Sequence, residues 1–175
     1  MIRRFLIAPI LVWCGTVVPA LRAQAAEESA VRRVVEAVAS LQEATDIAGL
    51  DTLFAPNPWV EIIEGSGVNH GWTDYRNNHL KPELAEMQHL SFWFFEIAPQ
   101  LRGNVAWAPF RYELAADTPS EHVDIEGRGT AILERRGPRW VGGSAPAYIR
   151  TPKSPGRLSG WNNITTIITH RPPGA

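Results

Sequence analysis

The chain has 175 residues, of which 45% are hydrophobic, and this is enough to build one domain with a substantial core. Its 17 basic and 18 acidic residues give a formal net charge of −1 at pH 7. The excess of acidic residues, which grows to a net charge of −4 once residues 1–25 are removed, argues against nucleic acid as a partner, because phosphate binding needs clustered positive charge. The sequence also shows no motif typical of a nucleotide cofactor site.

Residues 1–25 have the layout of a secretory signal peptide. Two arginines precede an apolar run, Phe5–Val18, and the small-residue site Ala23–Ala25 follows it. The run is too short to span a bilayer as a helix. We therefore expect cleavage after Ala25, which leaves a periplasmic or secreted protein that has no membrane partner. Three arginines and Cys14 leave with the peptide, so the mature chain has no cysteine metal ligand and a net charge of −4, from 14 basic and 18 acidic residues.

Two helices are predicted after the cleavage site. Glu28–Thr45 places valines and a leucine at helical spacing with charged residues between them, which indicates an amphipathic helix. A shorter helix over Ile47–Phe54 is ended by two prolines. Trp59–Glu64 is then a β-prone run that stops at a glycine-rich turn.

The next stretch, "EGSGVNHGWTDYRNNHL", is predicted to be a loop leading into a helix from about Trp72, with a break before Pro82. Long strands follow over Leu90–Gln100, Asn104–Ala115 and His122–Arg135, and turn-like segments between them indicate an antiparallel meander. A fourth strand starts at Arg139–Val141, and the sequence does not visibly finish it. Helices followed by hairpin-linked strands predict an α+β domain in which helices close a curved sheet around a conical pocket.

Three segments resemble the nuclear transport factor two-like superfamily, in its SnoaL-like and ketosteroid-isomerase-like branch. They are "LDTLFAPNPWVEIIEGSG", "VNHGWTDYRNNHL" and "HVDIEGRGTAILERRGPRW", together with the N-terminal helix that precedes them. The resemblance covers residues 26–141. It implies a cone-shaped α+β fold, with the N-terminal helices packed on a strongly curved antiparallel sheet. It leaves the activity open, because this fold hosts isomerases, cyclases, dehydratases, binding proteins and association domains.

Residues 142–175 form a tail rich in proline and glycine that departs from the resemblance. The resemblance implies a fourth strand of the form W-x-V-x-H-L-H-T-S, whereas this chain has "VGGSAPAYIRTPK" after Trp140. Codons for Gly142–Ile149, read one base later, can encode V-D-L-H-L-H-T-S. We therefore hypothesise a frameshift near residue 141, which makes the tail non-native and removes a strand from the sheet. The alternative is a divergent native tail.

A divalent metal site is one interpretation of the histidine-bearing stretch. His70 and His79, with Asp74, offer imidazole and carboxylate ligands suited to zinc, copper or non-haem iron. Nine residues of regular helix, however, put His79 on the side opposite His70, and no H-E-x-x-H signature is present. The interpretation that both are hydrogen-bonded loop and helix residues is therefore favoured.

A catalytic acid–base pair is a second interpretation, with Asp74, His70 and Tyr75 as candidates. Glu126 and Arg128 alternate onto one face of a strand, where they either reach a ligand or form an ion pair on the solvent side. The aromatic residues would form the core first, and a minority of them would reach a cavity. The predicted ligand-binding residues are His70, Trp72, Asp74, Tyr75, His79, Glu126 and Arg128.

The function expected from these observations is that of an exported small-molecule- or metal-binding protein of the SnoaL-like type, with its ligand in the conical pocket. One alternative is an enzyme like ketosteroid isomerase or a cyclase, which would show a buried base in the pocket. Another is an association domain without catalysis, which forms a homodimer through the sheet and would show exposed aromatic residues there.

Overall fold

A computed structural model of the protein describes residues 17–56, 61–64 and 67–152. Two helices come first, and a continuous helical segment made of α3, the π-helix η1 and α4 follows the first hairpin. The helices are α1 (Val17–Glu43), α2 (Ile47–Leu53), α3 (Gly71–Tyr75), η1 (Arg76–Leu80) and α4 (Lys81–Glu86). The strands are β1 (Glu61–Glu64), β2 (Gly67–His70), β3 (Gln88–Phe95), β4 (Gln100–Arg102), β5 (Val105–Asp117), β6 (His122–Arg136) and β7 (Arg139–Pro152).

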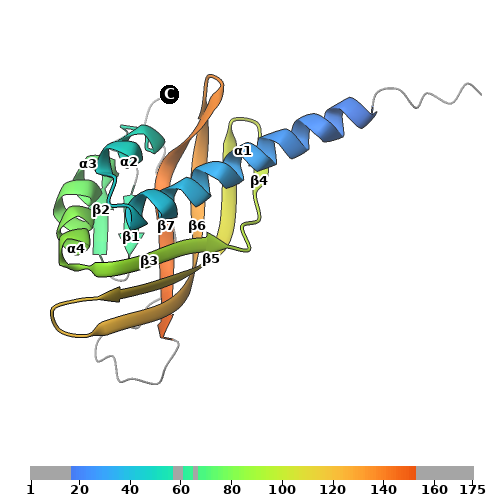
Figure 1. Ribbon diagram of the computed structural model, residues 1–175. Coiled ribbons are helices and arrows are strands. Elements are labelled where there is room, and N and C mark those ends of the chain that lie inside the picture. Colours follow the sequence, from blue (N-terminus) through green and yellow to red (C-terminus); the bar gives the residue numbers. More distant parts are fainter. Residues whose placement is uncertain (1–16, 57–60, 65–66, 153–175) are drawn as a thin grey trace, which may run out of the picture.

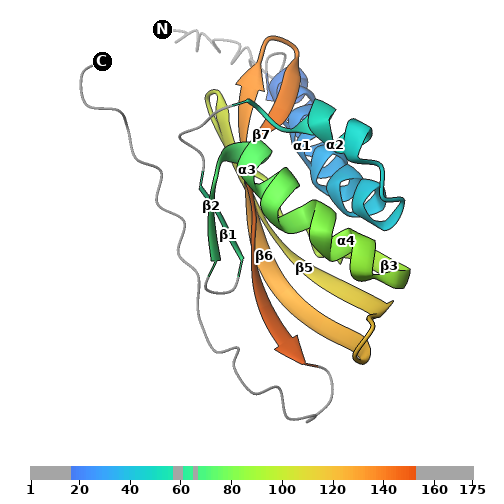
Figure 2. The same cartoon turned by 90° about the vertical axis from the view of Figure 1, so that its left-hand side faces the viewer.

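The strands form one sheet in the order β2-β1-β7-β6-β5-β3, and β4 pairs with β5. All of these pairs are antiparallel except that of β1 with β7, which is parallel. The sheet is strongly curved, and the helices lie on one of its faces (Figures 1 and 2). The predicted α+β arrangement of N-terminal helices packed on a curved antiparallel sheet is therefore confirmed.

Helix α1 packs on the sheet through the apolar face that the sequence predicts. Val31, Val35 and Val38 are buried at helical spacing, while the charged residues between them are exposed. Helix α2 starts at Asp46, whose carboxylate accepts a hydrogen bond from the backbone N–H of Gly49 at 2.8 Å. Within the described part of the chain, no helix is long and apolar enough to cross a membrane.

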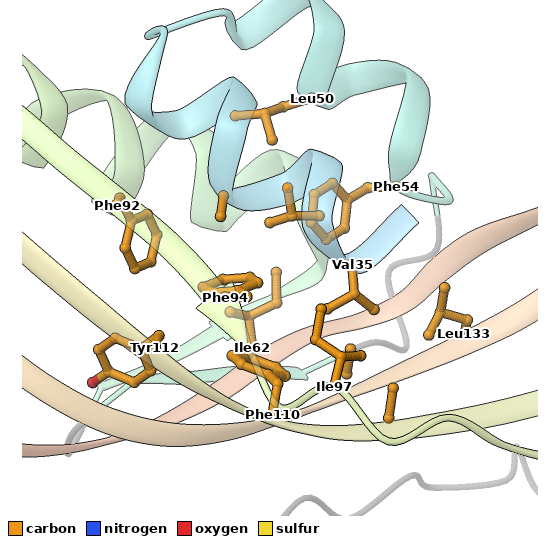
Figure 3. Packing of buried hydrophobic residues seen from close by; sticks show 14 of the residues in the cluster. Val35, Leu50, Phe54, Ile62, Phe92, Phe94, Ile97, Phe110, Tyr112 and Leu133 are labelled. Carbon is orange, nitrogen blue, oxygen red and sulfur yellow. The ribbon is translucent and has the colours of Figure 1, made fainter. Parts of the chain in front are cut away.

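The core lies between α1 and the concave face of the sheet (Figure 3). Along β5 the even-numbered residues from Ala106 to Ala116 are buried and their odd-numbered neighbours are more exposed, as the two-residue period of a strand requires. Phe94 stacks on Phe110 with 4.3 Å between ring centroids, and Phe92 meets Tyr112 edge-on at 5.9 Å.

Three boundaries differ from the sequence-based expectations. The strand predicted over Leu90–Gln100 is two strands, because β3 ends at Phe95 and Glu96 takes a left-handed φ of 50°. The helix predicted to break before Pro82 continues, and Pro82 lies at the start of α4, directly after the π-helical turn η1. The segment predicted as a loop after the Gly65–Gly67 turn begins with β2, which pairs with β1.

Strand β7 is also longer than expected. Its backbone pairs with β6 from Arg139 to Pro152, with register shifts near Thr130 and Ile132, so the expected loss of a strand is wrong. Whether residues 142–152 are encoded in the native frame stays a prediction, and residues 153–175 lie outside the described part of the chain. Gly142 lies against Phe54, and a Cβ there would come within 2.9 Å of the phenyl ring.

Substitution of Phe54 tests the contact between α2, α3 and β7. Its ring is 7% exposed and stacks on Trp72 with 4.1 Å between centroids. We expect Phe54→Ala to lower the free energy of unfolding by about 3–5 kcal/mol, because the change leaves a cavity in the core. Urea denaturation measures this loss. Val105, 42% exposed, is the control, and Val105→Ala should stay within about 0.5 kcal/mol. Equal effects of the two changes would contradict the packing described.

Candidate functional site

The histidine-bearing stretch forms the end of β2 and the helical segment after it. Gly71, with φ of 82°, allows the chain to turn directly from the strand into α3. The carboxylate of Asp74 accepts the backbone N–H of His70 at 2.8 Å, and its other oxygen accepts the side-chain amide of Asn78 at 2.6 Å. The Asn78 amide, followed by the His70 N–H, lowers the pKa of Asp74 below its usual value. Asp74 is thus an ionised group that holds the turn from β2 into α3.

Trp72 joins α2 to α3 and lies in the core. Its ring stacks on Phe54, and its indole N–H donates to Oδ1 of Asp51 at 2.7 Å. Arg76 donates to the same oxygen at 2.8 Å. Burial raises the pKa of Asp51, but the hydrogen bonds from Trp72 and Arg76 outweigh it, so the net shift of this pKa is downward. Trp72 therefore joins α2 to α3 within the core.

The π-helix η1 places Tyr75, His79 and Glu83 in a row. The rings of Tyr75 and His79 stack with 5.2 Å between centroids, and Nε2 of His79 is 3.7 Å from Oε2 of Glu83. π-Helical turns are rare and are frequent at functional sites. Among the described residues, no group of three histidine, cysteine or acidic side chains is arranged to hold a metal ion. His70 is exposed at the end of β2, and it is not brought into this row.

A hollow lies between the C-terminal end of α1, α4 and the inner face of β3, β5 and β6. It encloses about 20 Å³, and it is lined by Gln42, Tyr75, Glu83, Leu84, Met87, Leu90, Phe92, Tyr112, Leu114 and Ile125. Tyr75 is the predicted site residue that lines it, and His79 stacks beside Tyr75. Gln42 is a polar side chain inside the core, only 6% exposed.

The sequence did not predict Gln42 or Glu83 as site residues, and it placed Tyr112 only among the aromatic residues, a minority of which would reach a cavity. A signal for Gln42 existed, because it follows Val35 and Val38 on the buried stripe of α1, where a glutamine is unexpected. Glu83 follows His79 by four residues on the same helical segment, which places the two side chains on one face. Tyr112 carried no signal beyond the general excess of aromatic residues.

Glu126 and Arg128 lie on the opposite face of the sheet from the hollow. Leu114 and Ile125 are register partners that line the hollow, so Glu126, next along β6, points to the outer face. There it pairs with Arg111, which also bonds Glu96 at 3.0 Å. The two predicted ligand residues are thus separated from the hollow by the sheet, because their strand presents them to its other side. The ion pair that Glu126 forms is with Arg111.

The fold has known relatives among solved structures. No family model matches the sequence, and no curated protein matches it. A proposed scytalone dehydratase from Novosphingobium aromaticivorans is similar with a TM-score of 0.70 at 13% identity, over 83% of this chain and 98% of that one.

Two further solved structures are similar over most of their own length. A nuclear transport factor 2-like superfamily protein from Salmonella enterica serovar Typhimurium has a TM-score of 0.62 at 16% identity, over 81% of this chain and 99% of that one. A proposed ketosteroid isomerase from Shewanella frigidimarina has a TM-score of 0.55 at 20% identity, over 63% and 86%. The chain therefore has the cone-shaped nuclear transport factor two-like fold.

The role of Asp74 as a capping group gives a pH prediction. Because its pKa is lowered in the folded state, the carboxylate stabilises the fold above its unfolded pKa of about 3.9, and this contribution is lost as the pH falls through the folded pKa. We expect Asp74→Asn to lower Tm at pH 7, and the difference from wild type to shrink below about pH 4. Thermal melts across this range measure it. Thr73→Ala is a non-titrating neighbour, and its Tm difference should not vary with pH.

Proposed function

We propose that the protein is an exported binder of a small, mainly apolar molecule that carries a hydroxyl or carbonyl group. The observation that supports this most directly is the buried amide of Gln42 within a mainly apolar wall. An amide both donates and accepts hydrogen bonds, so it can orient either group, while Leu84, Leu90 and Phe92 cover the apolar part. The similar structures named for ketosteroid isomerase and scytalone dehydratase support a ligand of this chemistry.

Ligand entry requires side chains at the rim to move. The hollow encloses about 20 Å³, enough for water, whereas pockets for organic ligands measure roughly 300–1,000 Å³. Met87 and Leu90 are partly buried at the junction of α4 and β3, and they line this hollow. Methionine has three rotatable bonds and adapts to irregular shapes, so rotation of Met87 opens the space beside Gln42.

An acid–base enzyme is the second candidate, and the row of Tyr75, His79 and Glu83 favours it. Tyr75 and Glu83 both line the hollow, and the imidazole of His79 lies near both side chains. A carboxylate and a phenol that face the same bound carbonyl can remove a proton at one position and donate a hydrogen bond at another. Glu83 takes the place that the sequence reasoning gave to Asp74.

We also propose that the outer face of the sheet forms a homodimer. Trp93 is 45% exposed there, and Phe95 and Trp107 are partly exposed on the same face. An exposed aromatic group of this kind beside charged residues is typical of a protein interface. Arg111 lies over the Phe95 ring, 5.0 Å from its centroid, and also forms an ion pair with Glu96. This face therefore combines an apolar patch with fixed charge.

Binding of 2-naphthol tests the proposed ligand site, because this fluorescent probe is apolar and carries one hydroxyl group. We expect residues 26–175 to bind it about fivefold more tightly than naphthalene, since a buried hydrogen bond contributes about 1 kcal/mol. Gln42→Leu should remove this preference, and Leu84→Trp should abolish binding by filling the hollow. Titrations followed by fluorescence measure Kd. Gln100→Leu, on β4, is the matched control and should keep the wild-type preference.

Equal affinity of wild-type protein for the two compounds would contradict the role given to Gln42. Unchanged binding by Leu84→Trp would show that the ligand binds outside this hollow. Proton exchange at the carbon next to a carbonyl group, measured with 2-tetralone by NMR, separates the binder from the enzyme. Exchange that Glu83→Gln slows by about a hundredfold would favour catalysis, since general acid–base groups contribute roughly 10²–10⁴-fold.

The dimer is tested by placing a charge in the exposed aromatic patch. We expect Trp93→Lys to raise the dissociation constant of the dimer by about tenfold or more, because central aromatic residues contribute most of the binding energy at interfaces. Sedimentation velocity over a concentration series measures it. Val68, 48% exposed on β2 and outside the patch, provides the control Val68→Lys, which should leave the dimer intact. A wild-type protein that stays monomeric at all concentrations would rule the interface out.

A further inference from the structure

Met87 stands at the junction of α4 and β3, at one side of the hollow (Figure 1). It directly follows α4, and its φ of −87° and ψ of 128° turn the chain from helix into extended backbone. Its side chain is partly buried against the core. The sequence contains one other methionine, Met1, and its single cysteine is Cys14. Met87 is therefore the only sulfur-containing residue in the chain after Cys14.

The hollow has the size and the polar groups that a small peroxide needs. It encloses about 20 Å³, enough for roughly one water molecule, and hydrogen peroxide is larger than water by a single oxygen atom. Gln42 and Glu83 line the same space as Met87. An amide donates and accepts hydrogen bonds and a carboxylate accepts them, so these two side chains can hold a peroxide beside the thioether.

We propose that Met87 is an oxidation site, at which a peroxide converts the thioether to a sulfoxide and thereby closes the hollow to apolar ligands. A lone pair of the sulfur attacks one peroxide oxygen, so an S–O bond forms and the O–O bond breaks. The leaving oxygen takes the proton of the transferred oxygen and departs as water. The sulfur loses the two electrons that the peroxide gains. The effect on binding rests on the proposed function, since it regulates the same site.

Oxidation changes the wall of the hollow beside Gln42. The methionine side chain is flexible and apolar, whereas the sulfoxide is polar and carries a strong hydrogen-bond acceptor. The Gln42 amide is a donor for the new oxygen, so it is no longer available to a ligand hydroxyl group. Leu84 and Phe92 line the same space and offer the oxygen no donor. An apolar ligand that enters therefore removes water from the sulfoxide without replacing its hydrogen bonds, and its affinity falls.

Treatment with hydrogen peroxide, followed by peptide mass spectrometry and ligand titration, tests the site. We expect the folded wild-type protein to gain one oxygen on the peptide that contains Met87, and its Kd for 2-naphthol to rise by about tenfold. Met87→Leu keeps the apolar bulk without the sulfide, so the same treatment should leave this variant at its own untreated Kd. Reduction of the sulfoxide by a methionine sulfoxide reductase and a dithiol should return the wild-type protein to its untreated Kd.

A sulfide placed away from the hollow provides the matched control. Val68 is 48% exposed on β2, whereas the hollow is lined from α1, the helical segment α3–α4, β3, β5 and β6. Val68→Met, combined with Met87→Leu, moves the sulfide to this exposed position. Peroxide should oxidise it at least as fast as it oxidises Met87, because susceptibility follows exposure. The Kd for 2-naphthol should not change on this oxidation.

Two outcomes would overturn the proposal directly. One is a folded wild-type protein that stays unoxidised under conditions that oxidise the sulfide at position 68, and the other is complete oxidation of Met87 with an unchanged Kd. A Kd that stays raised after complete reduction would also overturn it, because the change would then come from other damage.

Failure of the untreated protein to bind 2-naphthol would count against the proposed function instead. The oxidation site is then read from stability, which needs no ligand. Oxidation should lower Tm of the wild-type protein by several degrees, because it places a polar group against the core, and it should leave Tm of Met87→Leu unchanged. A wild-type Tm that is equal with and without the sulfoxide would overturn the proposal.

Discussion

Side chains alternate across the two faces of β5 and β6, and this alternation decides which residues can take part in the site. Leu114 and Ile125 are paired across the two strands and face the helices, so Glu113 and Glu126 must face the other way. The inner face is therefore almost entirely apolar, and the charged residues of these strands gather on the outer face. Polar groups reach the hollow from the helices instead, mainly through Gln42 and Glu83.

The sequence predicted the helices and strands well wherever a period was clear. The valines of α1 and the alternation of β5 repeat often enough to identify each element, and the order of elements then indicated the cone. Boundaries were harder, because they depend on local backbone states. Strand β3 ends at Phe95 because Glu96 adopts a left-handed backbone conformation, and a glutamate in the sequence does not predict that conformation. The start of α1 was missed for a related reason, since an exposed overhang has no apolar period.

The site was predicted less well, because its histidine and aspartate residues have structural roles and its buried polar residue is a glutamine. His70 and Asp74 serve the turn from β2 into α3, where a backbone N–H needs an acceptor. The row of Tyr75, His79 and Glu83 depends on a π-helical turn, and no sequence pattern predicts such a turn. Gln42 was visible as a polar residue on an apolar stripe, and a buried polar group of that kind is costly unless something satisfies it.

The parallel pairing of β1 with β7 also shapes how this protein folds. It joins Glu64 to Tyr148, whereas the β5–β6 and β6–β7 hairpins connect neighbouring segments of the chain. Closing so long a loop costs entropy before any contact is gained, and such contacts slow folding. The hairpin of β1 and β2 leaves the ribosome early, but its place in the sheet exists only after β7 has been made. Completion of the sheet is therefore a late event in folding, and the edge of β7 stays open to other strands until then.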